Sequence, residues 1–223
     1  MPDRLPLFPL GMVLFPGLVL PLHVFEERYR TMVADLLALP QDEQRFGVVA
    51  IREGREVGAD GIPALHEVGC TAQLRRAERH EDGRYDIVTT GADRFRLAGV
   101  SSDRPYLVGE VEWLEDGPGD ADEAALLAGG VRAAFADYLR ALATAGGDEL
   151  ELPELPSDPV VLSHLVAATV SVDLADRQAL LAEPDGRSRL SAELRLLRRE
   201  TVLLEVLGAL PSSELTRGPV SPN

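Results

Sequence analysis

The residues best suited to metal chemistry stand close together in the first third of the sequence: His66, Glu67 and Cys70. A structural zinc site needs four ligands of this kind, and the sequence offers no second cluster to complete the set. We therefore expect Cys70 to be a buried thiol on a strand, with His66 and Glu67 on a loop. No metal is predicted.

Two further histidines could take part in acid–base chemistry, but each stands alone. His23 precedes Glu26 and Glu27 and is expected to have a structural role, while His164 lies in an apolar stretch and is expected at the edge of a helix. The sequence contains neither a G-x-S-x-G nucleophile motif nor a G-x-G-x-x-G nucleotide motif. It therefore predicts no catalytic residue, no cofactor and no independent hydrolase.

Five arginines could form a basic strip on two neighbouring strands: Arg75, Arg76, Arg79, Arg94 and Arg96. Such a strip could bind RNA, but the formal net charge of -15 repels phosphate backbones and anionic membranes. Aromatic side chains, which would stack on bases, do not interleave with these arginines. We expect a solvated strand face, balanced by acidic neighbours, and no nucleic acid partner.

The single cysteine allows no intrachain disulfide, so nothing indicates an oxidising compartment and we expect a cytoplasmic protein. The apolar run at residues 5–22 raises the question of a signal peptide or a membrane span. Its prolines and glycines would break a helix repeatedly, and no small-residue cleavage site follows it. We expect neither a targeting segment nor a membrane partner.

Residues 5–114 show mainly strand signals, because apolar and polar side chains alternate along several short runs. The dipeptide Asp82-Gly83 lies between two of these runs and suits a tight turn that needs a positive φ. Strands near 68–80 and 84–91 are therefore predicted to pair as a hairpin. The Gly-rich, charged stretch 53–63 is predicted to be a long exposed loop.

One helix is predicted inside this region and should end at Pro40. Its apolar side chains recur every three or four residues and should share one face: Phe25, Tyr29, Met32, Val33, Leu36 and Leu37. Together, these strands and the helix predict a mostly β subdomain over residues 1–114.

The acidic Gly/Pro run 115–123 is predicted to be a linker, and a helical subdomain should follow at 124–208. Its first helix should bury a face with a period of three to four residues: Ala124, Leu127, Val131, Phe135, Tyr138 and Leu142. Asp158, followed by a proline, and Asp173 are predicted N-caps of the next two helices.

The last helix carries a coiled-coil-like seam that we expect to pack inside a helical bundle rather than between two chains: Leu190, Leu194, Leu197, Thr201 and Leu204. The polar, Pro-rich tail 209–223 is predicted to be disordered.

Three segments in this order resemble the N-terminal, substrate-binding domain of Lon proteases. The first contains the turn at Phe15-Pro16-Gly17 and an F-E-x-R-Y pattern from Phe25 to Tyr29. The second is the D-G-R-Y turn at residues 82–85 with the strand after it, and the third is the helical run 161–200. The resemblance covers about residues 5–208.

The resemblance implies an α+β fold: a PUA-like β pseudo-barrel of about six strands with one helix, followed by a C-terminal helical bundle. An AAA+ module and a peptidase would each need a lysine, for a P-loop and for a Ser/Lys pair. All 22 basic residues here are arginines, and only about fifteen residues follow the last predicted helix. We therefore expect a free-standing, non-catalytic member of the family.

The function implied by the resemblance is recognition of unfolded or damaged polypeptide segments. Candidate binding residues lie in the first apolar, Pro- and Gly-broken segment: Leu10, Met12, Phe15 and Leu18. They could instead simply fill the barrel. Three alternatives stay open: an adaptor for one protease or chaperone, a PUA-like RNA-binding protein, and a small-molecule pocket between the two subdomains. The oligomeric state is left open too.

Overall fold

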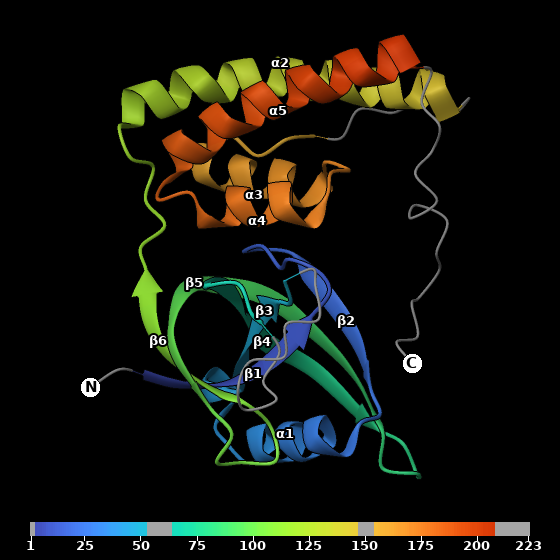
Figure 1. The fold of residues 1–223 in the computed structure, drawn as a ribbon, viewed down its shortest axis with the longest axis vertical. Coiled ribbons are helices and arrows are strands. Elements are labelled where there is room, and N and C mark those ends of the chain that lie inside the picture. Colours follow the sequence, from blue (N-terminus) through green and yellow to red (C-terminus); the bar gives the residue numbers. More distant parts are fainter. Residues whose placement is uncertain (1–2, 53–63, 147–153, 208–223) are drawn as a thin grey trace.

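The protein is described here by a computed structural model of residues 3–52, 64–146 and 154–207. Figure 1 shows a strand-built unit with a helical unit stacked on one end of it. The predicted loop 53–63 and the predicted disordered tail 209–223 lie outside the described residues.

In the described part of the chain, six strands form a single sheet in the order β2-β5-β4-β3-β1-β6. Their bounds are β1 (Asp3–Leu10), β2 (Val19–Val24), β3 (Arg45–Ala50), β4 (Val68–Arg79), β5 (Tyr85–Ser101) and β6 (Val108–Leu114). β1 and β3 run parallel, and the other paired strands run antiparallel.

Strand β5 closes this sheet into a barrel because it is long enough to pair along both of its edges. One edge pairs with β4. The other edge pairs with β2 at its start, where Tyr85 faces Val24, and with β6 further on, where Arg94 faces Leu114. The pairing of β1 with β6 completes the ring. The predicted six-stranded pseudo-barrel is thereby confirmed.

The predicted hairpin at Asp82-Gly83 joins β4 to β5. Gly83 has a φ of 82°, which a residue with a side chain rarely adopts, and its amide donates to the carbonyl of His80. The turn pairs Arg79 with Tyr85 in register. Local turn chemistry was enough to place this element.

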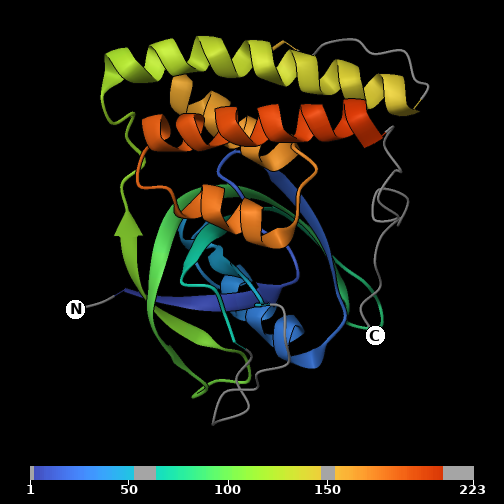
Figure 2. The same ribbon diagram turned by 45° about the horizontal axis from the view of Figure 1, so that its top comes forward.

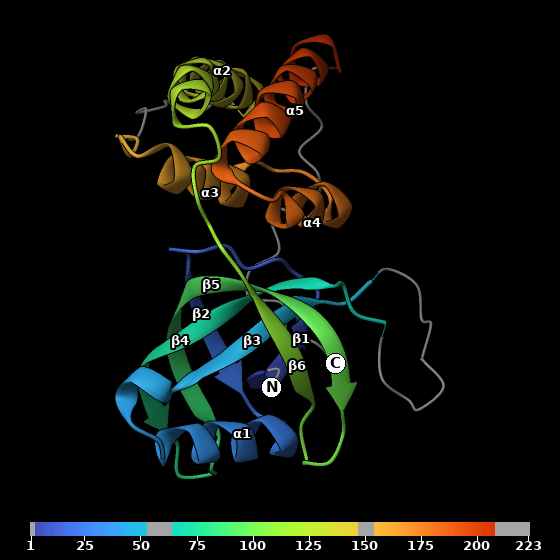
Figure 3. The same cartoon turned by 90° about the vertical axis from the view of Figure 1, so that its left-hand side faces the viewer.

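Helix α1 (Glu27–Leu37) packs on the end of the barrel away from the helical unit (Figure 3). Tyr29, Met32, Val33 and Leu36 are buried, and the Tyr29 ring stacks on Phe8 with centroids 4.0 Å apart. The prediction was wrong at both ends of the apolar face. Phe25 and Leu37 are each 41% exposed, because Phe25 precedes the N-cap and Leu37 is the last helical residue.

Within residues 121–146 and 154–207, four helices build the other unit in two layers. They are α2 (Ala121–Gly146), α3 (Pro159–Thr169), α4 (Leu174–Ala182) and α5 (Gly186–Leu207). The long helices α2 and α5 lie side by side in the outer layer (Figure 2), while α3 and α4 lie between them and the barrel (Figure 3). Among the described residues, no helix is both long and apolar enough to cross a membrane.

The predicted caps and faces of this unit form as expected. Asp158 accepts hydrogen bonds from the amides of Val160 and Val161, and Asp173 accepts one from Asp176. The α2 face and the α5 seam both enter the bundle core, so the seam packs within this chain. The predicted linker is shorter than expected, since α2 begins at Ala121.

One apolar core runs through both units. It contains Val13, Phe15, Ala50 and Val68 from the barrel together with the buried faces of all four bundle helices. The bundle therefore closes the end of the barrel by direct side-chain packing.

Gly91 on β5 provides a test of this packing. Its amide donates to Leu18, its carbonyl accepts from Gly17, and an added Cβ would lie 2.1 Å from the carbonyl oxygen of Phe15. Backbone cannot move away as a flexible side chain would. Gly91→Ala should therefore lower the free energy of unfolding by about 2 kcal/mol, as measured by urea denaturation.

Gly129→Ala is the matched control, because nothing lies within 4 Å of the Cβ it would add. In the interior of α2 it should raise the free energy of unfolding by about 0.5–1 kcal/mol. Equal effects of the two alanines would contradict this account of the barrel end.

Candidate functional site

Arg94 joins the barrel to the bundle. It lies on β5 with a side chain only 1% exposed, and its guanidinium donates to the carbonyls of Leu181 (2.8 Å), Glu183 (2.6 Å), Pro184 (3.2 Å) and Glu115 (3.2 Å). The first two carbonyls lie at the C-terminal end of α4, where a cation is favoured by the helix dipole.

A second buried arginine binds the same helix end from the bundle side. Arg189, fully buried on α5, donates to the carbonyl of Leu180 (3.1 Å) and to the hydroxyl of Ser163 (2.9 Å). Asp116 stands between the two guanidinium groups, 3.1 Å from that of Arg94 and 3.3 Å from that of Arg189. We call Arg94, Asp116, His164 and Arg189 the junction cluster.

The surroundings of the junction cluster shift the pKa values of Asp116 and His164. Burial by itself would raise the pKa of Asp116, but the hydrogen bond from His164 and the two guanidinium charges lower that pKa to about 2. Burial lowers the pKa of His164. The carboxylate is therefore charged at neutral pH, and the ring is favoured in its neutral form, donating its Nε2 hydrogen to Asp116.

Backbone hydrogen bonds next to the junction cluster fix the segment that was predicted to be a linker. The carbonyl of Gly117 accepts from the amide of Gly186 (2.9 Å), and that of Pro118 accepts from Arg187 (3.0 Å). Buried Gln178 of α4 adds a bond of 2.8 Å from its Nε2 to the carbonyl of Val68 on β4. Helix α4 is thus held against the barrel at several points.

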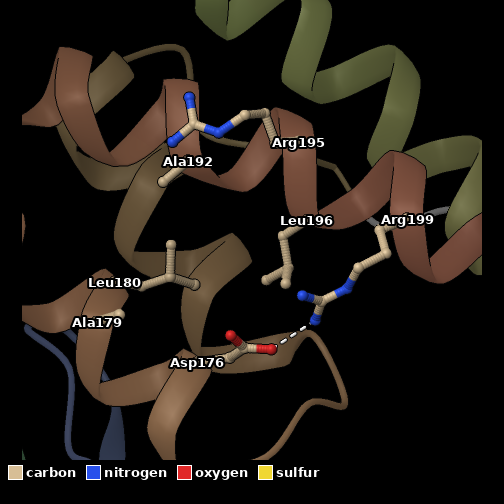
Figure 4. A pocket seen from close by; sticks show the side chains of 7 residues that line it. All are labelled: Asp176, Ala179, Leu180, Ala192, Arg195, Leu196 and Arg199. Atoms are coloured by element: carbon tan, nitrogen blue, oxygen red, sulfur yellow. Dashed lines mark hydrogen bonds and ion pairs between the residues drawn. The ribbon is translucent and has the colours of Figure 1, made fainter.

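A hollow of about 230 Å³ opens between α4 and α5. Its lining residues are Asp176, Ala179, Leu180, Ala192, Arg195, Leu196 and Arg199. Figure 4 shows Leu180 and Leu196 facing each other across it, while the Arg199 guanidinium reaches Asp176. Arg195 forms no ion pair with any described residue and donates only to Ser191. The hollow can accept an apolar side chain with an acidic neighbour.

A second hollow, of about 390 Å³, lies on the other side of α4, against the barrel. Its lining is more polar and includes Arg52, His66, Glu67 and Arg96. Burial, followed by the charge of Arg52, lowers the pKa of His66. Ala179 is exposed and borders both hollows, so we call the two together the α4 hollows.

The first hollow continues along the outside of α5. Leu203 and Val206 follow Leu196 and Arg199 at helical spacings of three to four residues, which places them on one stripe. Leu203 is 43% exposed and Val206 is 75% exposed. These two side chains extend the exposed apolar surface beyond the hollow along α5.

The predicted binding residues of the first apolar segment are distributed differently. Leu10, Met12 and Leu18 are half-buried and pack against the barrel core, so each keeps some exposed surface. Phe15 is fully buried in the core shared with the bundle, with its ring centroid 6.4 Å from that of His164. Phe15 therefore offers no surface to a partner in this conformation.

Other predicted residues need correction. Arg94 does not belong to an exposed basic strip, because the bundle covers it, and His164 is buried in the junction cluster rather than at a helix edge. Cys70 is a buried strand thiol as expected, and burial raises its pKa. The sequence analysis did not identify the α4 hollows, because the first depends on how α4 packs against α5 and the second combines residues far apart in the chain.

The fold and this surface define a barrel-and-bundle module with an apolar hollow rimmed by arginine. A family model described as the ATP-dependent protease La (LON) substrate-binding domain matches residues 4–199. The chain belongs to this family.

Similar full-length proteins are Lon proteases. Lon protease 2 of Myxococcus xanthus is 28% identical over 214 residues, which are 95% of this chain and 25% of that protein. Lon protease of Escherichia coli (strain K12) is 26% identical over 204 residues, or 91% of this chain and 26% of that protein. The chain thus spans about a quarter of the length of the curated relatives it matches.

Two solved structures share the fold. The Lon N-terminal domain protein from Xanthomonas campestris has a TM-score of 0.58 and 27% identity, covering 88% of this chain and 98% of that one. The N-terminal domain of Mycobacterium avium complex Lon protease has a TM-score of 0.63 and 17% identity, covering 90% and 98%. The α+β prediction is confirmed.

The charge of Asp116 should be visible in the pH dependence of stability. Asp116→Asn should lower the free energy of unfolding at pH 7 by about 3 kcal/mol, because two buried guanidinium groups lose their carboxylate. A pKa depressed from 3.8 to about 2 stabilises the fold above pH 4, and this contribution is lost as the pH falls towards 2. The deficit of the variant should therefore shrink by about 2 kcal/mol over that range.

Urea denaturation at a series of pH values measures both effects. Asp93→Asn is the control, because Asp93 is 60% exposed and stands 3.5 Å from Arg45, so its loss should cost less than about 0.5 kcal/mol. A deficit of Asp116→Asn that stays constant from pH 7 to pH 2 would rule out the assigned pKa shift.

Proposed function

We propose that this chain is a non-catalytic module that recognises unfolded or damaged polypeptide segments through the α4 hollows. The observation that carries the proposal is the first hollow, with its floor of Leu180 and Leu196, its rim of Arg195 and Arg199, and its exposed extension along α5. Membership of a family described as substrate-binding supports the same class of function.

The lining favours a segment that combines an apolar side chain with an acidic one. Leucine-sized groups fit an apolar floor, while a carboxylate would meet Arg195, which has no acidic partner among the described residues. The chain has a formal net charge of -15, so the arginine rim is a positively charged site on a negatively charged protein. It favours acidic over basic segments by charge complementarity.

Leu10, Met12 and Leu18 belong to the same proposal as a second contact surface. They lie at the barrel end and keep partial exposure, so an extended segment could add contacts there. Their role is separable from that of the α4 hollows, because none of the three lines either hollow.

The non-catalytic part of the proposal rests on composition. The sequence contains no lysine, which a P-loop and a Ser/Lys peptidase both require. The lining of the first hollow also holds no nucleophile beside a base. A cytoplasmic setting is proposed with it, because the one cysteine is buried and reduced.

Ala179→Glu is the variant that tests the site. Position 179 is exposed and helical, so glutamate is well tolerated there, but at the shared border of the α4 hollows its negative charge would pair with the arginine rim and repel an acidic segment. Affinity for a reduced, permanently unfolded model polypeptide should fall at least about tenfold, or 1.4 kcal/mol. Fluorescence anisotropy at two salt concentrations measures it, with the native form of the same polypeptide as the reference for selectivity.

Ala133→Glu is the matched control, since Ala133 is an exposed alanine on α2 outside both hollows. Its affinity should equal that of the unmodified chain. A loss with Met12→Ser but none with Ala179→Glu would move the site to the barrel end. Absence of binding to any unfolded polypeptide would exclude general recognition and favour an adaptor for one dedicated partner.

A further inference from the structure

Three potential metal ligands from distant parts of the chain meet on the outside of the barrel. The Nδ1 atom of His23 lies 2.5 Å from one carboxylate oxygen of Asp86, and the Nε2 atom of His80 lies 2.8 Å from the other. The ligand atoms of all three residues lie within 4.8 Å of one another. This group lies apart from the α4 hollows and from the junction cluster.

The backbone holds the three residues together. His23 on β2 faces Asp86 on β5 directly in the strand register. His80 begins the turn between β4 and β5, and its amide donates to the carbonyl of Arg84 at 2.8 Å. The side chains themselves are free to adjust, because 45% of His23, 36% of His80 and 54% of Asp86 are exposed.

We propose that His23, His80 and Asp86 form a binding site for Zn²⁺ or a chemically similar divalent transition metal. Two imidazoles and one carboxylate are ligands that zinc prefers, whereas Mg²⁺ and Ca²⁺ require oxygen ligands. Three protein ligands leave a fourth position open to water or to a group from a partner.

Binding exchanges two hydrogen bonds for metal bonds. The Nδ1 atom of His23 and the Nε2 atom of His80 would each present a lone pair to the ion, with the ring hydrogen on the other nitrogen. Zinc bonds of about 2.0–2.1 Å bring ligand atoms to about 3.3 Å from each other. Small rotations of exposed side chains are enough to reach that spacing from 4.8 Å.

Arg84 should weaken metal binding, so its substitution tests the proposal. Its Nη1 atom lies 3.3 Å from the Nε2 atom of His23, and its Nε atom is bound to Asp82 at 2.6 Å. When the metal holds Nδ1, the Nε2 atom must carry the hydrogen, which then faces another donor. Arg84→Ala removes this clash and a nearby positive charge, so it should strengthen metal binding.

The metal would also join separate parts of the barrel. Strand β2 stands at the end of the strand order and pairs with β5 alone. A metal shared by His23 and His80 would tie β2 to the turn between β4 and β5. Thermal stability should therefore rise with the concentration of zinc.

Calorimetric titration of the full chain with zinc chloride tests the proposal. We expect saturable binding of one ion per chain, no binding of Mg²⁺, and a zinc-dependent rise in the melting temperature. His80→Ala and Asp86→Asn should each weaken binding at least about tenfold, while Arg84→Ala should strengthen it by a comparable factor. The control is Asp93→Asn, which removes an exposed carboxylate elsewhere on β5 and should leave zinc binding unchanged.

Circular dichroism of each variant without metal verifies that it is folded. The proposal is overturned if the unmodified chain shows no saturable zinc binding up to millimolar concentration. It is equally overturned if Asp93→Asn weakens zinc binding as much as Asp86→Asn, or if Arg84→Ala weakens it. Each result is independent of polypeptide binding at the α4 hollows, so the two proposals can fail separately.

Discussion

The architecture depends on the burial of one arginine at the C-terminal end of α4. A guanidinium removed from water is costly unless its donors are matched, and Arg94 finds four backbone carbonyls and the carboxylate of Asp116. Two of these carbonyls, those of Leu181 and Glu183, lie at the C-terminal end of α4, whereas the Cα of Arg94 lies on barrel strand β5. The position of α4 is therefore set by the hydrogen bonds of Arg94 as well as by apolar packing. Because α4 borders both hollows, their shape depends on that position.

Local signals in the sequence were sufficient for most of the elements. Asp82-Gly83 specified a turn because few other dipeptides tolerate the required φ, and Asp158 and Asp173 marked helix starts because a side-chain oxygen can satisfy free amides there. The buried face of α2 was predicted from apolar residues that recur every three to four positions. The fold class itself came from the family resemblance, which supplied the barrel closure that no local pattern contains.

The candidate sites could not be predicted in the same way. Arg94 and Phe95 are consecutive on β5 and both are buried, one under the bundle and one inside the barrel. Alternation places them on opposite faces, but only the docking of helices from much later in the chain covers the outer one. Likewise, His23 and Asp86 meet because β2 pairs with β5 over a long sequence separation. The local sequence around either residue does not predict this contact.

The pairing of β1 with β6 has a consequence for the growing chain on the ribosome. The ring cannot close until β6, the last strand, has been synthesised and pairs with β1. Contacts this distant in sequence form slowly. Even a closed ring would still expose Phe15 and an unmatched Arg94 until α4 had emerged. A nascent chain therefore passes through a stage in which an apolar barrel end and a charged guanidinium are both exposed, and such a partly folded intermediate is prone to aggregate until α4 docks.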